Sequence, residues 1–488
     1  MSARVAVVGA GISGLAAAHR LRTLLGPDAE IVVLEQRDRI GGVLRTVELA
    51  GMPFDVGAEA FLARRPEVPA LLRELGIDDL RTHPTRAAAS VRAGGRTGPL
   101  PPGTLLGVPT SAARLDGLLS AAATAAVAAE PDLPLGWEPG SDVALGGLLR
   151  ARFGDELADR LADPLLGGVY AGRVDALGLR ATIPALAAAL DAGATSLTAA
   201  ADAASRDVPA RGSGALGARV EPSRSASRGE EVVPGASATP VFGAVRGGYR
   251  VLLDALREAA GADVRLGTTV RELRRTPDGW QLALGPTTSP ELLDVDAVVL
   301  AVPAPAVAKL LAAAAPAAAR AAGEIELASS VVVGLAYRAQ DATSLPSTSG
   351  LLIATGEPLA AKAFTHSSTK WAHLGADGTV RLRASLGRFG EAASLQVDDA
   401  ELVARVRKDL VGLAGITAEP VDVHVQRWGG GLPQYGVHHL DRVRAVEDGL
   451  PAGLAVVGAA LHGVGVPACL ATAHAAAERL GVALVTAG

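Results

Sequence analysis

The stretch VAVVGAGISG, residues 5–14, decides how the rest of the chain can be arranged. Val5–Val8 is a short, largely β-branched apolar run, which is typical of a strand buried on both faces. Gly9, Gly11 and Gly14 follow at G-x-G-x-x-G spacing, and residues 15–25 have the pattern of a helix. These glycines allow a tight turn, a close approach to a pyrophosphate and close packing of helix on strand. The sequence therefore predicts a dinucleotide-binding turn, with the phosphates at the N-terminal end of the helix.

Two features that follow the turn indicate which dinucleotide is bound. A second strand, residues 31–34, ends at Glu35, where an acid accepts hydrogen bonds from ribose hydroxyls. Arg39 and the doublet Gly41-Gly42 come a few residues later. Such a doublet lets a further backbone segment close over the pyrophosphate and ribityl part of a longer cofactor. The pattern favours FAD over an ordinary loop that contains two glycines.

Length, charge and cysteine content exclude several classes of function. A chain of 488 residues allows roughly two to four domains. The net charge of −5, without a basic stripe, argues against nucleic-acid binding. The single cysteine, Cys469, excludes an intrachain disulfide framework, and its apolar surroundings predict a buried structural thiol. No run of 18 or more residues is a convincing membrane span, so a cytoplasmic protein is expected.

The order of the remaining patterns predicts a discontinuous fold. The start of the chain has too few strands for a complete doubly wound sheet, and further buried strands are predicted near 296–302 and 454–458. Helical patterns dominate from 112 to 204, including predicted helices at 112–129 and 156–166. Residues 209–240, rich in Ser, Arg, Gly and Pro, are expected to form a linker or surface loop.

We therefore expect an α/β protein with three parts. They are a discontinuous Rossmann-like FAD-binding domain (1–51, 241–303 and 440–488), a mixed α/β substrate-binding domain (52–110, 205–240 and 304–439) and a helical insertion (111–204). At the C-terminal end, Gly465-Val466-Pro467 opens a helix predicted over 469–480. The free N–H groups at its start could face the flavin N1/O2 edge, which becomes anionic on reduction.

With both ends of the chain considered together, the sequence resembles the flavin-dependent porphyrinogen oxidases, which are relatives of the monoamine oxidases and phytoene desaturases. The resemblance runs nearly end to end and is carried by Phe54–Leu62, DPLLGGVYAG at 163–172, Lys370-Trp371, Trp428, Pro433-Gln434-Tyr435 and GVGVP at 463–467. It is closest to the Gram-positive type, some members of which oxidise coproporphyrinogen III rather than protoporphyrinogen IX. It implies an FAD-dependent oxidase of haem biosynthesis that removes six electrons from a porphyrinogen in three steps and reduces dioxygen to peroxide.

The resemblance and the turn motifs together define the expected site residues. The predicted cofactor-binding residues are Gly9, Ala10, Gly11, Ile12, Ser13, Gly14, Glu35, Gln36, Gly42, Val43, Arg45, Gly57, Ala58, Glu59, Ala60, Val270, Trp428, Gly465, Val466 and Pro467. The predicted substrate residues are Arg64, Arg65, Val169, Tyr170 and Tyr435. A porphyrinogen needs flat apolar walls and arginines for its propionates. Arg65 matches a basic family position near a propionate, although an Arg pair capping the helix after Pro66 is an equal alternative.

Several alternatives stay open at this point. Protoporphyrinogen IX is the alternative substrate, and an amine oxidase or carotenoid desaturase is the alternative enzyme. Four lysines and few aromatic residues fit an amine oxidase poorly. A non-catalytic flavoprotein is the alternative outside enzymes. No general base or metal ligand set can be assigned, and the oligomeric state and a peripheral membrane contact through the helical insertion are undecided.

Overall fold

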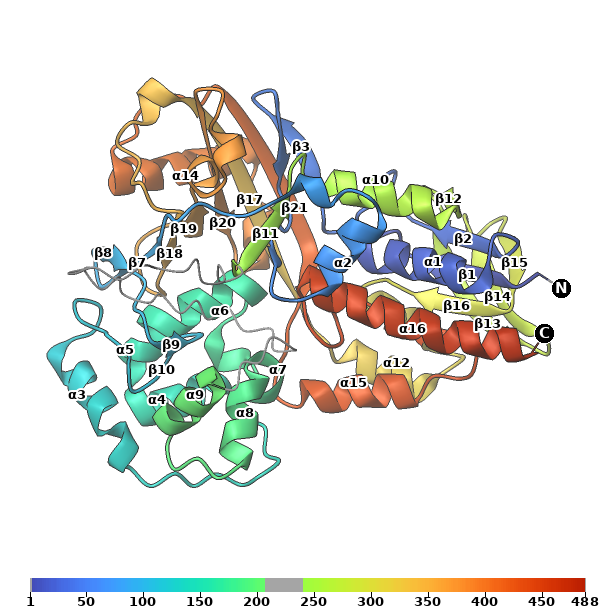
Figure 1. Ribbon diagram of the computed structural model, residues 1–488, viewed down its shortest axis with the longest axis horizontal. Coiled ribbons are helices and arrows are strands. Elements are labelled where there is room, and N and C mark those ends of the chain that lie inside the picture. Colours follow the sequence, from blue (N-terminus) through green and yellow to red (C-terminus); the bar gives the residue numbers. More distant parts are fainter. Residues whose placement is uncertain (1, 207–239, 488) are drawn as a thin grey trace, which may run out of the picture.

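A computed structural model describes residues 2–206 and 240–487 of the chain. Its first layer is a parallel five-stranded sheet drawn from distant parts of the sequence (Figure 1). The strands, in spatial order, are β12 (Asp263–Arg265), β2 (Glu30–Leu34), β1 (Arg4–Val8), β16 (Ala297–Leu300) and β22 (Leu454–Val456).

The central strand β1 explains why its sequence is continuously apolar. Val5 and Val7 point into the core cluster on one face of the sheet, and Ala6 and Val8 into the cluster on the other. Alternation of side chains along a strand requires this when both faces are covered.

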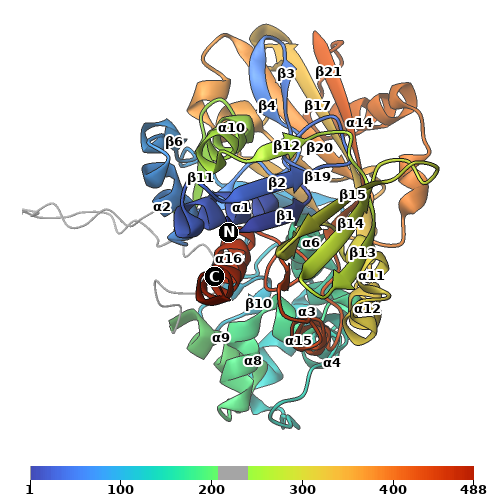
Figure 2. The ribbon, with the colours of Figure 1, turned by 90° about the vertical axis from the view of Figure 1, so that its right-hand side faces the viewer.

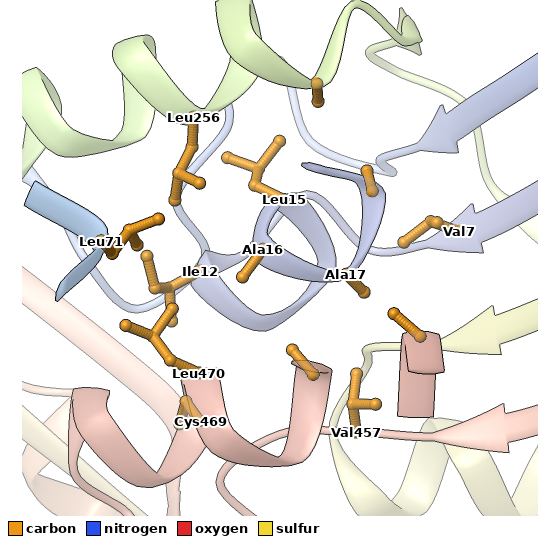
Figure 3. Packing of buried hydrophobic residues seen from close by; sticks show 14 of the residues in the cluster. Val7, Ile12, Leu15, Ala16, Ala17, Leu71, Leu256, Val457, Cys469 and Leu470 are labelled. Atoms are coloured by element: carbon orange, nitrogen blue, oxygen red, sulfur yellow. The ribbon is translucent and has the colours of Figure 1, made fainter. Parts of the chain in front are cut away.

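Helices cover the first face and a small sheet covers the second. The first face carries α1 (Ile12–Leu25), α2 (Glu67–Glu74), α10 (Tyr249–Ala260) and α16 (Val466–Ala487). Figure 3 shows Ile12 and Ala16 of α1 lying close to Cys469 and Leu470 of α16. The second face carries the sheet β13 (Val270–Thr276), β14 (Gly279–Leu284) and β15 (Glu291–Val295), with helices α11 (Ala304–Leu311), α12 (Pro316–Gly323) and α15 (His439–Asp448).

A second, mostly antiparallel sheet forms the substrate side of the molecule. Its strands, in spatial order, are β21 (Asp422–Pro433), β17 (Leu327–Arg338), β20 (Thr379–Leu386), β19 (Ala361–Thr365), β18 (Gly350–Ile353), β7 (Ala89–Ala93) and β8 (Arg96–Pro99). One face packs against α14 (Asp399–Ala414). On the other face, Val332 and Ala336 of β17 join Trp371 and Trp428 in a separate cluster.

Small elements connect the two large sheets. Two of them are the hairpin of β3 (Thr46–Leu49) with β4 (Met52–Asp55), and the three-stranded group β5 (Phe61–Leu62), β11 (Phe242–Val245) and β6 (Arg81–Thr82). A third is α13 (Ser367–Lys370), which contacts β20, whereas the hairpin of β9 (Thr104–Leu105) with β10 (Val108–Pro109) packs in the core of the helical insertion.

The helical insertion has its own apolar core below the second sheet (Figures 1 and 2). It contains α3 (Ala121–Ala129), α4 (Leu145–Phe153), α5 (Asp155–Leu157), a π-helical turn (Ala158–Ala162), α6 (Asp163–Tyr170), α7 (Leu179–Thr182), α8 (Pro184–Asp191) and α9 (Leu197–Arg206).

Two predicted helices of the insertion were wrong in extent. The helix expected over 112–129 begins only at Ala121, because Gly117 takes a φ of +78° and Ser120 caps the helix by accepting a hydrogen bond from the Ala123 N–H. The helix expected over 156–166 is interrupted by the π-helical turn just before Pro164. Proline lacks the N–H that would bond the carbonyl four residues back, so the regular helical register cannot continue through it.

The predicted domain limits can be compared with the strand order. All strands of the five-stranded sheet fall within 1–51, 241–303 and 440–488, whereas the limit at residue 51 divides the β3–β4 hairpin. The predicted linker at 209–240 lies, apart from Pro240, outside the described residues. Within the described residues, one helical stretch, Val466–Thr486, is long and apolar enough to cross a membrane by length and composition, and its first part packs on α1.

Candidate functional site

At two positions of the glycine-rich turn between β1 and α1, the structure has room only for glycine. A Cβ on Gly9, whose φ is +105°, would lie 2.5 Å from the carbonyl oxygen of Ala301. A Cβ on Gly14 would lie 1.9 Å from the carbonyl oxygen of Gly9. The N-cap of α1 is Gly11, which offers no side chain to the first N–H groups of the helix. These donors are therefore available to an anion, as a pyrophosphate site requires.

The glycine doublet lies directly beside this turn. Gly41 donates its N–H to the carbonyl oxygen of Ala10 at 2.8 Å, and a Cβ on Gly42 would lie 3.3 Å from the Cα of Gly11. Arg39 holds the doublet from behind, with its guanidinium bonded to the carbonyl oxygens of Ile40 (3.1 Å) and Gly42 (2.9 Å). Two backbone segments thus come together where both were predicted to cover a pyrophosphate.

Glu35 ends β2 with its side chain buried next to the turn. Its two carboxylate oxygens accept hydrogen bonds from the N–H groups of Ala10 and Arg37, each at 2.9 Å. A carboxylate has about four lone-pair directions, so each oxygen can accept another hydrogen bond. The arrangement suits a ribose diol.

The segment 55–60 is held against the doublet by the second sheet. A Cβ on Gly57 would lie 2.1 Å from the carbonyl oxygen of Val43, and Val56 donates its N–H to the carbonyl oxygen of Arg45. Trp428 on β21 donates its indole N–H to the carbonyl oxygen of Val56 at 2.9 Å. Arg383 on β20 donates to the carbonyl oxygens of Asp55 and Gly57. The predicted cofactor segments at 42–45, at 57–60 and at Trp428 are therefore adjacent. The role of each stays a prediction.

Two carboxyl groups at this segment have oppositely shifted pKa values. Burial alone would raise the pKa of Glu59, but Lys370 Nζ at 2.8 Å and Arg383 at 3.7 Å lower it to about 2. Burial raises the pKa of Asp55 to about 7 in spite of hydrogen bonds from Thr46 and the Tyr249 N–H. Both line a cavity of about 20 Å³, enough for one water molecule. Glu59 is thus a fixed anion, and Asp55 is the group here that can change charge near neutral pH.

The loop after β22 joins the C-terminal helix to the first turn of α1. Gly458 donates its N–H to Thr472 Oγ1 of α16 at 3.2 Å, and the Cβ position of Gly458 lies 3.6 Å from Ser13 Oγ. Val466 and Pro467 form the first turn of α16, beginning next to Gly465. Cys469, at the end of this turn, is buried, as predicted.

Two predicted substrate residues lie together at the end of α6. The rings of Tyr170 and Tyr435 are 5.5 Å apart, and the Tyr435 hydroxyl donates to the carbonyl oxygen of Ala459 at 2.6 Å. Burial raises the pKa of Tyr170 to about 12, so it stays a neutral phenol. Val169 is partly buried beside them in the same cluster. These aromatic side chains therefore reach the loop that leads to α16.

Sequence reasoning missed two partners of these tyrosines. His439 stacks on the Tyr435 ring with centroids 3.9 Å apart and bonds the Leu461 carbonyl oxygen through Nε2 at 3.0 Å. Gln434 donates its side-chain N–H to the carbonyl oxygen of Tyr170. The run Gln434-Tyr435 followed by a His pair was the available signal, but only the fold shows that these side chains meet.

The two predicted substrate arginines differ in their surroundings. Arg65 is in an ion pair with Glu67, and both side chains are largely covered. Arg64 is exposed and makes no hydrogen bond or ion pair with any described residue. Arg64 is therefore the arginine whose charge is available to a carboxylate.

The other predicted cofactor residues are distributed as follows. Ala10, Ile12 and Ser13 are buried at the turn, whereas Gln36, Val43 and Ala58 are exposed and Arg45 and Ala60 are half-buried. Arg45 bonds Gln426 Oε1 at 2.6 Å, and Val270 is the first residue of β13. Val43, beside the glycine doublet, is apolar and yet 45% exposed. A bound cofactor would cover this side chain. Within the described residues no group of three potential metal ligands occurs.

Together, the glycine-rich turn, the glycine doublet, Glu35 and the segments beside them form a cradle that fits FAD. The uncapped helix, the close approach of Gly11 and Gly42, and the Glu35 carboxylate provide for a diphosphate and a ribose. The cradle extends beyond the length that a mononucleotide needs, along residues 43–45, 56–60 and 428 and the first turn of α16. A bound flavin supplies hydride and electron transfer, which none of these side chains can perform.

Comparison with known proteins agrees with this geometry. The flavin-containing amine oxidoreductase family matches residues 12–481, and the chain belongs to that family. The expected flavin is thereby confirmed. Within the family, the chain is 44% identical to a coproporphyrinogen III oxidase of Mycobacterium leprae, over 97% of both chains. It is 27% identical to a coproporphyrinogen III oxidase of Bacillus subtilis, over 97% of this chain and 96% of that one. The resemblance to porphyrinogen oxidases is therefore confirmed.

Solved structures give the same fold. A crystal structure from Exiguobacterium, provisionally described as a protoporphyrinogen oxidase, superposes with a TM-score of 0.81 at 28% identity, over 99% of both chains. Cyclohexylamine oxidase from Brevibacterium oxydans superposes with a TM-score of 0.70 at 15% identity, over 99% of this chain and all of that one, which shows the fold alone. The predicted α/β fold with a Rossmann-like FAD-binding part is confirmed.

Acidification is expected to destabilise the protein through His439. Burial lowers the pKa of this imidazole to about 4, whereas in the unfolded chain it is about 6.5. Between these values only the unfolded chain binds the proton, so the free energy of unfolding falls by about 1.4 kcal/mol for each pH unit below 6.5. We expect His439→Phe to lose this part of the pH dependence in urea unfolding between pH 7.5 and pH 4.5. Equal slopes for the variant and the parent would contradict the assignment.

Proposed function

We propose that this protein is an FAD-dependent coproporphyrinogen III oxidase. It removes six electrons and six protons from the macrocycle to give coproporphyrin III, while three dioxygen molecules are reduced to hydrogen peroxide. The observation that carries the proposal is the end-to-end similarity, at 44–45% identity, to mycobacterial proteins named coproporphyrinogen III oxidase. The FAD cradle and the neighbouring aromatic side chains support it.

In this proposal the chain acts mainly by holding the reactants. When bound, FAD would supply the hydride acceptor for each two-electron step and the route of the electrons to dioxygen. Gly9–Gly14 and Glu35 anchor the diphosphate and the ribose. The N-terminal end of α16, with its positive dipole, would favour negative charge on a flavin bound beside it. Tyr170 and Tyr435 form an apolar wall beside the loop that precedes α16. The product is aromatic, so positioning supplies most of what the protein contributes.

Protoporphyrinogen IX is the second candidate substrate. The Exiguobacterium structure, described as a protoporphyrinogen oxidase and 28% identical, favours it. Protoporphyrinogen IX carries two propionates and coproporphyrinogen III carries four, so the number of carboxylate contacts distinguishes the two substrates. A cytoplasmic location and a peripheral membrane contact stay predictions.

Anaerobic mixing with each porphyrinogen tests the proposal. The purified holoprotein should lose its oxidised flavin absorbance with coproporphyrinogen III, and readmission of oxygen should give fluorescent coproporphyrin and peroxide. A faster reaction with protoporphyrinogen IX would favour the second candidate. A flavin that neither porphyrinogen reduces would refute both and favour a non-catalytic flavoprotein.

Arg64→Ala and Arg65→Ala are expected to differ in their effect on KM. Arg64 has no partner among the described residues, so its loss should raise KM for coproporphyrinogen III about tenfold if it binds a propionate. Arg65→Ala should change KM less, because Glu67 already neutralises that guanidinium. Flavin content should be unchanged in both variants. Steady-state kinetics under matched oxygen measure the difference, and a larger effect at Arg65 would restore its assignment to the propionate.

A further inference from the structure

A second cavity, of about 170 Å³, lies at one end of the seven-stranded sheet. It is lined by the residues where β18 ends, β19 begins and β20 ends, together with Arg173 from the loop after α6. The side chains that line it and matter for binding are Arg173, Thr355, Glu357, Lys362, Arg388 and Glu391. At roughly 30 Å³ per water molecule, the space accommodates several waters or a carboxylate with the carbons that carry it.

Most charges around the cavity are already neutralised in pairs. Arg388 bonds Asp163 at 2.7 Å, with both side chains almost fully covered. Arg173 bonds Glu391 at 2.6 Å, and Glu357 bonds Arg92 at 3.0 Å. One positive charge is left over, and it belongs to Lys362.

Lys362 has no carboxylate partner among the described residues. Its Nζ donates one hydrogen bond, to the carbonyl oxygen of Gly387 at 2.6 Å, and an ammonium group has three N–H donors. Burial and then the charge of Arg388 lower its pKa to about 8, against the opposing effect of Glu391, so the ammonium is still the main form at pH 7. A nearby anion would raise this pKa. The half-buried ammonium therefore has both spare donors and an unbalanced charge.

The cavity is joined to the predicted ring-binding residues by α6. Asp163, the partner of Arg388, is the first residue of this helix, and Tyr170 is the last. Phe389 donates its N–H to the carbonyl oxygen of Ala171, just after Tyr170. At 1.5 Å per residue, the two ends of α6 are about 10 Å apart. The cavity and the aromatic pair thus lie along one short helix.

We propose that this cavity binds a carboxylate through Lys362 Nζ, and that the carboxylate is a propionate group of the porphyrinogen. A single unbalanced positive charge matches a monoanion, whereas a dianion such as phosphate would bring a second negative charge for which the paired side chains leave no partner. The identity of the ligand rests on the proposed function, whereas the carboxylate chemistry does not.

The carboxylate chemistry is tested with propionate itself. Propionate, titrated into the holoprotein at constant ionic strength, should raise its thermal midpoint, and propionamide, which has the same shape without the charge, should not. Lys362→Met should abolish the rise, and Lys362→Arg should retain it. Lys408→Met removes an equal charge from an exposed position on α14 and should behave as the parent. An equal propionate response in Lys362→Met and the parent would overturn the proposal.

The identity of the ligand is tested with porphyrins, without turnover. Lys362→Met should weaken binding of coproporphyrin III about tenfold, measured by fluorescence, and leave binding of its tetramethyl ester unchanged. If propionate needs Lys362 but coproporphyrin III does not, the porphyrin assignment is overturned and a free carboxylate is the ligand. If the parent binds no porphyrin and oxidises no porphyrinogen, the proposed function fails, while the propionate titration still decides the site.

Discussion

Gly14→Ala is expected to yield a protein that retains less than about a tenth of the parental FAD. The added Cβ would lie 1.9 Å from the carbonyl oxygen of Gly9 and 3.2 Å from the Cβ of Ala301. Neither atom belongs to a flexible side chain that can move aside, so the turn between β1 and α1 must open. Overpacking of this kind costs about 1–3 kcal/mol of stability, and the opened turn no longer presents its N–H groups to a pyrophosphate.

The matched control for this change is Gly412→Ala. Gly412 lies in α14, where an added Cβ meets no atom within 4 Å. Alanine there should raise stability by about 0.5–1 kcal/mol and leave the flavin unaffected. Flavin stoichiometry, from the absorbance ratio of visible to protein bands, measures both variants. A Gly14→Ala protein with full flavin content would show that the turn tolerates a side chain and does not hold the diphosphate.

Arg381→Met is expected to lower the free energy of unfolding by about 3–5 kcal/mol. The guanidinium is fully buried and donates to the carbonyl oxygens of Leu49, Ala50 and Leu374 as well as to Asp377. Methionine fills similar space but leaves the carbonyl groups without donors, which is costly in the interior. Because Leu49 and Ala50 belong to the β3–β4 hairpin, the change loosens its attachment to β20.

An exposed arginine provides the comparison for this second prediction. Arg405 forms an ion pair with Glu401 one turn away on α14, with both side chains about half exposed. Arg405→Met should change stability by no more than about 0.5 kcal/mol. The two variants are compared by urea unfolding followed by tryptophan fluorescence. Equal midpoints would mean that the buried hydrogen bonds of Arg381 contribute no more than a surface pair.

The local motifs could be predicted from the sequence because their chemistry is local. The turn at 9–14 needs glycine for reasons of backbone geometry alone, and the unbroken apolar run of β1 indicated that both faces are covered. Aspartate is a favoured helix-capping residue for the same local reason, and Asp398 accepts the N–H of Glu401 at the start of α14. The C-terminal helix was predicted over 469–480 but extends over 466–487, because Gly481 does not end it and the exposed Val482 and Val485 had blurred the periodic pattern.

The interactions that brace the site could not be predicted, because each joins residues far apart in the chain. Arg383 reaches the backbone at 55–57, and Lys370 reaches Glu59. In the sequence, Arg381 and Arg383 occupy polar positions in a regular alternation of polar and apolar residues along β20. That spacing is compatible with a solvated strand face, and only the packing of the β3–β4 hairpin on this face makes the arginines interior.

The strand order of the five-stranded sheet has a consequence for how the protein is made. β1 can pair with β2 as soon as both have left the ribosome, but its other neighbour, β16, starts at Ala297 and pairs in turn with β22 at Leu454–Val456. The edge of β1 is open until β16 has emerged, and the edge of β16 is then open until β22 has emerged; unpaired strand edges promote aggregation of nascent chains. The five-stranded sheet is therefore complete only after residue 456 has been synthesised, and shielding of the nascent chain by chaperones should increase its yield.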